Sequence, residues 1–123
     1  MKIYKIGIIG CGGIAAKMAA TLGGMKGVAR YAVASRSIDK AQQFANDWQF
    51  TKAYSSYEAL ADDPEVDLIY IATPPAMHYD NARMCILKGK PVLCEKAFTA
   101  NARQAEELLQ LAKEKGVFIT EAI

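Results

Sequence analysis

Several short groups of residues in this sequence could bind or transform a small molecule. The first is a glycine turn at Gly10, Gly12 and Gly13, which follows an isoleucine-rich run and precedes an alanine-rich stretch. Glycine allows a tight turn and a close approach of the backbone to an anion. The N–H groups that open the following helix, near Ile14, would then face that anion at the positive end of the helix dipole. This pattern predicts a pyrophosphate-binding turn of a dinucleotide fold.

The glycine pattern also has a simpler interpretation, because glycines between a strand and a helix occur as plain turns. The third glycine of the usual G-x-G-x-x-G motif is replaced by Ala15, which is still small enough for the helix to pack on the strand. The position of the motif at the first predicted strand, and the regular alternation that follows, favour cofactor binding.

A second group, Ser35-Arg36-Ser37, follows the second predicted strand. An acidic residue at this place would accept hydrogen bonds from the ribose 2′-hydroxyl of NAD, but the first acid is Asp39. The Arg36 guanidinium could pair with a 2′-phosphate and stack on adenine, and Lys40 could add a second positive charge. The alternative is a solvated surface arginine. The predicted cofactor is NADP, with NAD possible as the second choice.

These groups are linked by an alternation of predicted strands and helices. Strands are expected near 6–9 and at 28–34, 52–54, 66–72, 91–94 and 117–120, with helices at 13–22, 38–48, after a capping box at Ser55-x-x-Glu58, from Pro75 to Gly89, and from an N-cap at Asn101 to Gly116. The last helix should bury a stripe of Ala105, Leu108, Leu109 and Ala112. This order predicts an α/β fold: a doubly wound parallel sheet, order 3-2-1-4-5-6, in a single three-layer domain.

In an open parallel sheet, ligands bind beyond the carboxyl ends of the strands, where the strand order reverses. The strands that flank this point are predicted to end at Gly10, Ser35, Thr73 and Glu95. We therefore expect one crevice lined by these loops, with Thr73 and Pro74 on the wall opposite the glycine turn.

The bulk composition excludes several classes of function. The chain has 123 residues, 23% of them charged, and a net charge of +2 without charged blocks, so neither a nucleic-acid nor a membrane partner is expected. Cys11, Cys85 and Cys94 show no metal-ligand spacing, and an odd count without a secretory signal predicts reduced thiols in a cytoplasmic protein. Core packing is the expected role of Tyr54, Tyr57, Tyr70 and Tyr79.

The motifs together resemble one known family. IGIIGCGGIA, AVASRS, VDLIYIATPPAMH, GKPVLCEKAFTANARQAEEL and FITEA, in this order and over the whole chain, are similar to the N-terminal domain of the Gfo/Idh/MocA oxidoreductases. ASRS and FITEA look most like the dihydrodiol dehydrogenase-type branch, which uses NADP. The resemblance implies hydride transfer to or from a hydroxyl or carbonyl group of a sugar, cyclic polyol or dihydrodiol.

The resemblance also implies roles for particular residues. In the family, a Glu-Lys pair after the fifth strand places the lysine beside the nicotinamide; here the pair is Glu95-Lys96, followed by Ala97 in place of the usual proline. Lys96 is then the expected catalytic residue, because an ammonium can donate or orient the proton of the reacting oxygen. Glu95 is expected to be a structural or cofactor-positioning acid, and both residues are counted among those that bind the cofactor. His78 matches the family pattern Thr-Pro-x-x-x-His and is expected to contact the cofactor or to support the loop.

Relatives in this family complete their active site with a second domain that also mediates dimerisation. We expect residues 1–123 to be the NAD(P)-binding domain, with the small-molecule substrate and homo-oligomer contacts in a C-terminal domain absent from this chain. A non-catalytic NAD(P)-sensing module is the main alternative. An S-adenosylmethionine methyltransferase is a further one, although it explains neither Arg36 nor Glu95-Lys96.

Overall fold

Strands and helices alternate along the chain in the computed structural model, which describes residues 2–95 and 102–122. The elements are β1 (Tyr4–Ile9), α1 (Gly13–Gly23), β2 (Val28–Ala34), α2 (Ile38–Trp48), β3 (Lys52–Tyr54), α3 (Tyr57–Asp62), β4 (Leu68–Ile71), the 3₁₀ turn η1 (Pro75–Met77), α4 (His78–Leu87), β5 (Val92–Glu95), α5 (Ala102–Lys115) and β6 (Ile119–Ala122).

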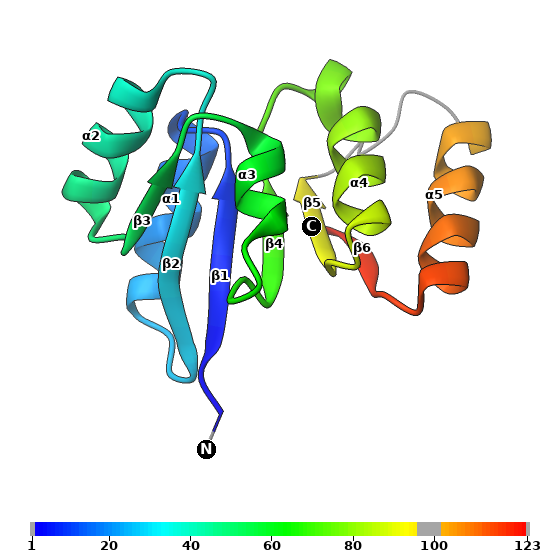
Figure 1. The fold of residues 1–123 in the computed structure, drawn as a ribbon, viewed down its shortest axis with the longest axis horizontal. Helices are drawn as coiled ribbons and strands as arrows, with labels where there is room; N and C mark the ends of the chain where they lie inside the picture. The colour runs from blue at the N-terminus through cyan, green and yellow to red at the C-terminus, as the bar shows by residue number, and fades with distance from the viewer. Residues whose placement is uncertain (1, 96–101, 123) are drawn as a thin grey trace.

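The strands form one parallel sheet of order β3-β2-β1-β4-β5-β6, as predicted, with helices on both sides (Figure 1). Its register places Ile9 of β1 opposite both Ala34 of β2 and Ile71 of β4. The central strands therefore end at one level, and the loops that follow them begin side by side at the carboxyl edge of the sheet.

Each face of the sheet carries its own hydrophobic cluster. Side chains alternate between the faces of a strand, so Ile9 and Ile71 pack with α3, α4 and α5, whereas Ile8 and Tyr70 pack with α1 and α2. The buried helix residues are Leu60, Ala61, Ala82, Cys85, Ile86, Leu108 and Ala112 on the first face, and Ala15, Ala19, Leu22, Phe44 and Ala45 on the second. The predicted three-layer α/β fold is confirmed. The four tyrosines that were expected to pack in the core do so: Tyr54, Tyr57 and Tyr79 in the first cluster and Tyr70 in the second.

The sixth strand begins later than the sequence indicated. It spans Ile119–Ala122 instead of 117–120, because residue 117 takes part in closing α5. Gly116 has φ +68°, its N–H donates to the Lys113 carbonyl at 3.2 Å, and the Val117 N–H donates to the Ala112 carbonyl at 2.9 Å. This pair of hydrogen bonds is a Schellman motif. The fourth strand also differs from prediction, because β4 spans Leu68–Ile71 and is shorter than the predicted 66–72.

Two helix details also differ from prediction. The N-cap of α3 is Ser56, whose Oγ accepts a hydrogen bond from the Ala59 N–H at 3.1 Å, so the predicted Ser55-x-x-Glu58 capping box is wrong. On α5, Leu108 is buried but Leu109 is 52% exposed, since the buried stripe follows Leu108 and Ala112. The predicted N-cap Asn101 lies outside the described residues.

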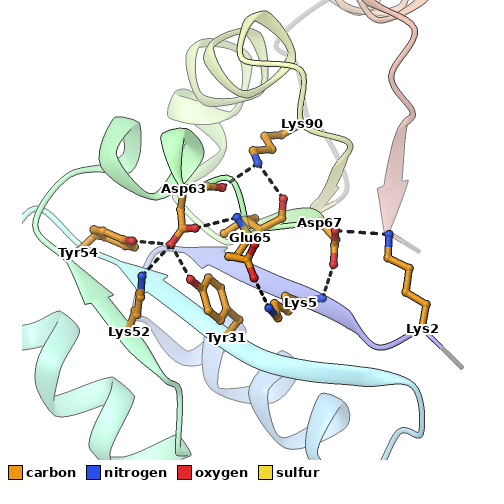
Figure 2. A network of polar contacts seen from close by, with 10 residues as sticks. Lys2, Lys5, Tyr31, Lys52, Tyr54, Asp63, Glu65, Asp67 and Lys90 are labelled. Atoms are coloured by element: carbon orange, nitrogen blue, oxygen red, sulfur yellow. Dashed lines mark hydrogen bonds and ion pairs between the residues drawn. The ribbon is translucent and has the colours of Figure 1, made fainter.

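A buried carboxylate joins distant parts of the chain at the turn between α3 and β4 (Figure 2). One Asp63 oxygen accepts hydrogen bonds from the hydroxyls of Tyr31 in β2, at 2.9 Å, and Tyr54 in β3, at 2.6 Å. Lys52 lies 3.6 Å from the same oxygen, and the Lys90 ammonium donates to the Asp63 backbone carbonyl at 2.8 Å. The Asp63 side chain is 3% exposed, so this network replaces its hydration shell.

Within the described ranges, no helix has the length and apolar character needed to span a membrane. The same part of the chain contains no group of three or more His, Cys, Asp or Glu side chains arranged to hold a metal ion.

Candidate functional site

A cavity of about 350 Å³ lies at the carboxyl edge of the sheet, where the order of the strands reverses. It is lined by Gly10, Cys11, Gly12, Gly13, Ile14, Ser35, Tyr57, Ala72, Thr73, Pro74 and Pro75. The structure therefore brings together the predicted glycine turn, the residue after β2 and the loop after β4. Tyr57, at the start of α3, was not among the residues predicted for the site.

The glycines of the turn differ in what requires them. Gly10 has φ +106°, and a Cβ there would lie 3.0 Å from the carbonyl carbon and oxygen of Ala72, so the fold itself demands glycine. At Gly12 and Gly13, φ is outside the left-handed region, and a Cβ would meet no protein atom within 4 Å. Neither backbone strain nor a protein neighbour accounts for these glycines. A ligand that approaches the backbone closely would account for both.

The N-terminus of α1 is open to such a ligand. Gly12 is the N-cap and provides no side-chain hydrogen bond, and the first turn contains no acidic residue. In contrast, Ser37 and Ser56 cap α2 and α3 with their hydroxyl groups. The first N–H groups of α1, including that of Ile14, can therefore donate to an anion in the cavity.

Arg36 lies on the wall of an adjoining cavity of about 430 Å³. Tyr57 lines both cavities, so the two compartments are neighbours along one crevice. Ser35 is 9% exposed, and its Oγ accepts a hydrogen bond from the Ser37 N–H at 3.2 Å, which shapes the turn after β2. Lys40 lines a third cavity of about 220 Å³, which shares Cys11 with the glycine cavity. Its predicted contribution of a second positive charge to the cofactor site stays a prediction.

The Arg36 compartment contains two acids that the sequence did not associate with the site. Glu58 and Asp80, from the first turns of α3 and α4, line the same cavity together with Met77 and Asn81. The predicted Ser55-x-x-Glu58 capping box included Glu58 but did not associate it with the site, because tertiary packing alone brings both acids to the loop after β2. Met77 did carry one signal, its place between Pro75 and His78 in the Thr-Pro-x-x-x-His pattern.

His78 supports the loop after β4 from inside the protein. The residue is 1% exposed, and its Nε2–H donates to the Thr73 carbonyl at a distance of 2.6 Å. The Thr73 hydroxyl in turn donates to Asn81 Oδ1 at 2.6 Å, and both residues are buried. Of the expected roles of His78, contact with the cofactor or support of the loop, this geometry favours support of the loop.

The predicted Glu95-Lys96 pair falls at the limit of the described residues. Glu95 is the last residue of β5, and the register pairs Cys94 with Ile71 of β4, so the backbone of Glu95 reaches the same sheet edge as Ala72. Lys96 lies outside the described residues. Its predicted catalytic role and the positioning role of Glu95 remain predictions.

Cys11 lines the glycine cavity but is not an activated thiol. Its Sγ lies 3.9 Å from the Ala34 carbonyl oxygen. Burial raises the pKa of the Cys11 thiol above its usual value, although Ser35 and Lys40 act in the opposite direction. The protonated thiol is a small side chain accommodated in the turn.

An open glycine turn at the switch point of a sheet in this order defines a dinucleotide-binding domain. Residues 4–122 match the model of one family, described as an oxidoreductase family with an NAD-binding Rossmann fold. The chain belongs to this family, the Gfo/Idh/MocA oxidoreductases.

Several characterised proteins are similar to the chain over most of its length. It is 45% identical over 92 residues to trans-1,2-dihydrobenzene-1,2-diol dehydrogenase from Mus musculus, an alignment that covers 75% of this chain and 28% of that protein. It is 47% identical over 96 residues to D-xylose 1-dehydrogenase (NADP(+)) from Hypocrea jecorina, with coverage of 75% and 25%.

The structure is also similar to that of KijD10, a 3-ketoreductase from Actinomadura kijaniata solved in complex with NADP. The TM-score is 0.93 at 30% identity, over 98% of this chain and 38% of that chain. The chain thus spans well under half the length of these relatives.

Proposed function

We propose that residues 1–123 form the cofactor-binding domain of an NADP(H)-dependent oxidoreductase, with NAD as the second choice of cofactor. The observation that carries the proposal is the crevice that runs from Gly12 and Gly13, where no protein atom requires glycine, to the guanidinium of Arg36. The anionic pyrophosphate of a dinucleotide fits the glycine end of this crevice, and the 2′-phosphate that NADP carries fits the Arg36 end.

Each part of the crevice has a proposed task. Gly10 closes the turn, while the N–H groups of Gly12, Gly13 and Ile14 hold the pyrophosphate. Arg36 donates to the 2′-phosphate, with Ser35 beside it and Lys40 contributing positive charge from farther away. The wall opposite is formed by Thr73 and Pro74, whose loop His78 supports, and by Glu95.

The bound nicotinamide would supply or accept the hydride. Lys96 is the proposed catalytic residue of this chain, and its ammonium would exchange the proton of the substrate oxygen as the hydroxyl and carbonyl forms interconvert. The proposed substrates are a sugar, a cyclic polyol or a dihydrodiol. The names of two relatives support the first and the last of these classes, because they contain D-xylose and a dihydrodiol. A C-terminal domain would complete the substrate site and a homo-oligomer, and the free cysteines fit a cytoplasmic enzyme.

The first test is calorimetric titration of this chain with NADPH, NADH and S-adenosylmethionine. We expect NADPH to bind most tightly, and Arg36→Ala to weaken NADPH binding by about tenfold or more while NADH binding changes little. Arg103→Ala, on the exposed side of α5, is the matched control and should change neither affinity. Binding of S-adenosylmethionine without either dinucleotide would overturn the proposal.

A second test separates an enzyme from a cofactor sensor. In the longer protein that carries this domain, Lys96→Ala should abolish turnover while NADPH still binds. A non-catalytic sensing module would bind NADPH equally well and would show no turnover before the substitution.

A further inference from the structure

Arg36 is in contact with the opposite side of its compartment. Its Nη2 donates to the Sδ of Met77 at 3.7 Å, a contact between residues 41 positions apart in the sequence. Arg36 belongs to the loop after β2, and Met77 is the last residue of η1 after β4. Both line the cavity of about 430 Å³, so the contact joins the walls on either side of it.

The backbone of Met77 is held by hydrogen bonds that reach into the core. The Met77 N–H donates to the Pro74 carbonyl at 2.9 Å, and Pro75 starts this 3₁₀ turn. The preceding Thr73 is anchored by the bonds from His78 and to Asn81, each 2.6 Å long. These buried contacts fix the backbone from which the Met77 side chain extends, whereas Arg36 itself is exposed.

A thioether is a suitable partner for an arginine that must also receive a phosphate. Sulfur is a neutral and weak acceptor, so it can orient a guanidinium without neutralising its charge. A carboxylate in the same place would form a strong, charge-assisted pair and compete with the phosphate. Glu58 and Asp80 lie on the walls of this cavity, yet within the part of the chain that the structure describes neither forms an ion pair with Arg36.

We propose that Met77 is a positioning residue that holds the Arg36 guanidinium across the compartment and thereby strengthens the preference for a cofactor with a 2′-phosphate. The inference rests on the proposed function. It adds to that function a residue from the second half of the fold as a determinant of cofactor choice.

The test compares the ratio of the NADH and NADPH dissociation constants among variants. Met77→Leu keeps the apolar volume and removes the acceptor, so the preference for NADPH should fall by about threefold. Met77→Gln supplies an amide oxygen at similar reach and should restore the preference. Met84→Leu, a half-buried methionine on α4 that lines a different cavity, is the control and should leave the ratio unchanged.

A double variant tests whether Met77 acts through Arg36. In an Arg36→Ala background, Met77→Leu should cause no further change in the ratio. An equal fall in both backgrounds would overturn the inference, as would a wild-type ratio in Met77→Leu. A wild-type chain that binds neither dinucleotide, or that does not prefer NADPH, overturns the proposed function together with this inference. A preference for NADPH that is undiminished in Met77→Leu overturns this inference alone.

Discussion

At the scale of single residues, the glycine turn separates what the fold needs from what a ligand needs. Gly10 is required by its φ of +106° and by the Ala72 backbone, so its presence says little about function. Gly12 and Gly13 face open space. Their small size matters only when something outside the protein approaches the backbone, which makes them the more informative glycines of the motif.

This difference predicts the effect of Gly12→Ala. Its φ of −86° suits alanine, so the free energy of unfolding should change by less than about 1 kcal/mol, the ordinary cost of a poor N-cap. A methyl group in front of the pyrophosphate should weaken NADPH binding by about tenfold or more, which calorimetry would measure beside urea unfolding.

The control for Gly12→Ala is Gly24→Ala, at the other end of α1. A Cβ at Gly24 would lie 3.7 Å from the Thr21 carbonyl oxygen, an ordinary contact far from the crevice. This variant should bind NADPH as the wild type does. Wild-type affinity in Gly12→Ala would show that the anion does not pass in front of this residue.

At the scale of elements, α3 is a short helix that depends on its N-cap. It has six residues, yet it buries Leu60 completely against the sheet and presents Tyr57 to the crevice. Isolated helices of this length are unstable in water. The Ser56 hydroxyl and the packing of Leu60 therefore hold α3 in place.

We predict that Ser56→Ala lowers the free energy of unfolding by about 1 kcal/mol, because the Ala59 N–H loses its acceptor. Ser55→Ala, one residue earlier and exposed, should change it by less than about 0.5 kcal/mol. Chemical denaturation of both variants measures the difference. Equal effects, or a larger effect at Ser55, would mean that the cap observed at Ser56 does not stabilise α3 in solution.

The helices and strands also show how much of the fold could be predicted from the sequence. Parallel strands joined by helices allow few strand orders, so the alternation of strands and helices was enough to predict the order of the sheet. Adjacent serines at 55 and 56 offer equivalent hydroxyls, and only the extended backbone of Ser56 selects the cap. Likewise, β6 begins late because Val117 takes part in the Schellman motif that ends α5.

The candidate site likewise contains residues that could be predicted from the sequence and residues that could not. Gly12, Ser35 and Thr73 were predictable, because each follows the end of a strand in the chain. Tyr57 and Met77 reach the crevice from the start of α3 and from η1. Their positions depend on how those elements pack against the sheet. Met77 lies within the local pattern Thr-Pro-x-x-x-His, but this pattern does not indicate that its side chain reaches Arg36.

At the scale of the whole molecule, the Asp63 network connects both halves of the sheet (Figure 2). Tyr31 and Tyr54 belong to β2 and β3, while Lys90 precedes β5. Lys5, at the start of β1, extends the network through its ion pair with Glu65. Asp63 therefore links the two halves of the sheet, through its carboxylate to β2 and β3 and through its backbone carbonyl to Lys90 before β5.

The charge of Asp63 is stabilised in the folded state. Burial by itself raises the pKa of this carboxyl group. The hydrogen bonds from Tyr54, the Glu65 N–H and Tyr31, together with the charge of Lys52, outweigh burial and lower the pKa from 3.8 to about 2. Because the folded pKa lies below the unfolded one, the carboxylate stabilises the fold above pH 3.8, and this contribution is lost as the pH falls through about 2.

We therefore predict that Asp63→Asn makes the free energy of unfolding less dependent on pH in acid solution. Between about pH 5 and about pH 2, the free energy of unfolding of the wild type should fall by about 2 kcal/mol more than that of the variant. The control is Asp62→Asn, which removes an exposed carboxylate paired with Lys88 and should leave this pH dependence close to that of the wild type. Urea unfolding followed by circular dichroism across this range measures all three proteins. If Asp63→Asn lost stability in acid as steeply as the wild type, the acid sensitivity would have to come from other carboxylates, and the buried network would matter for its hydrogen bonds and not for its charge.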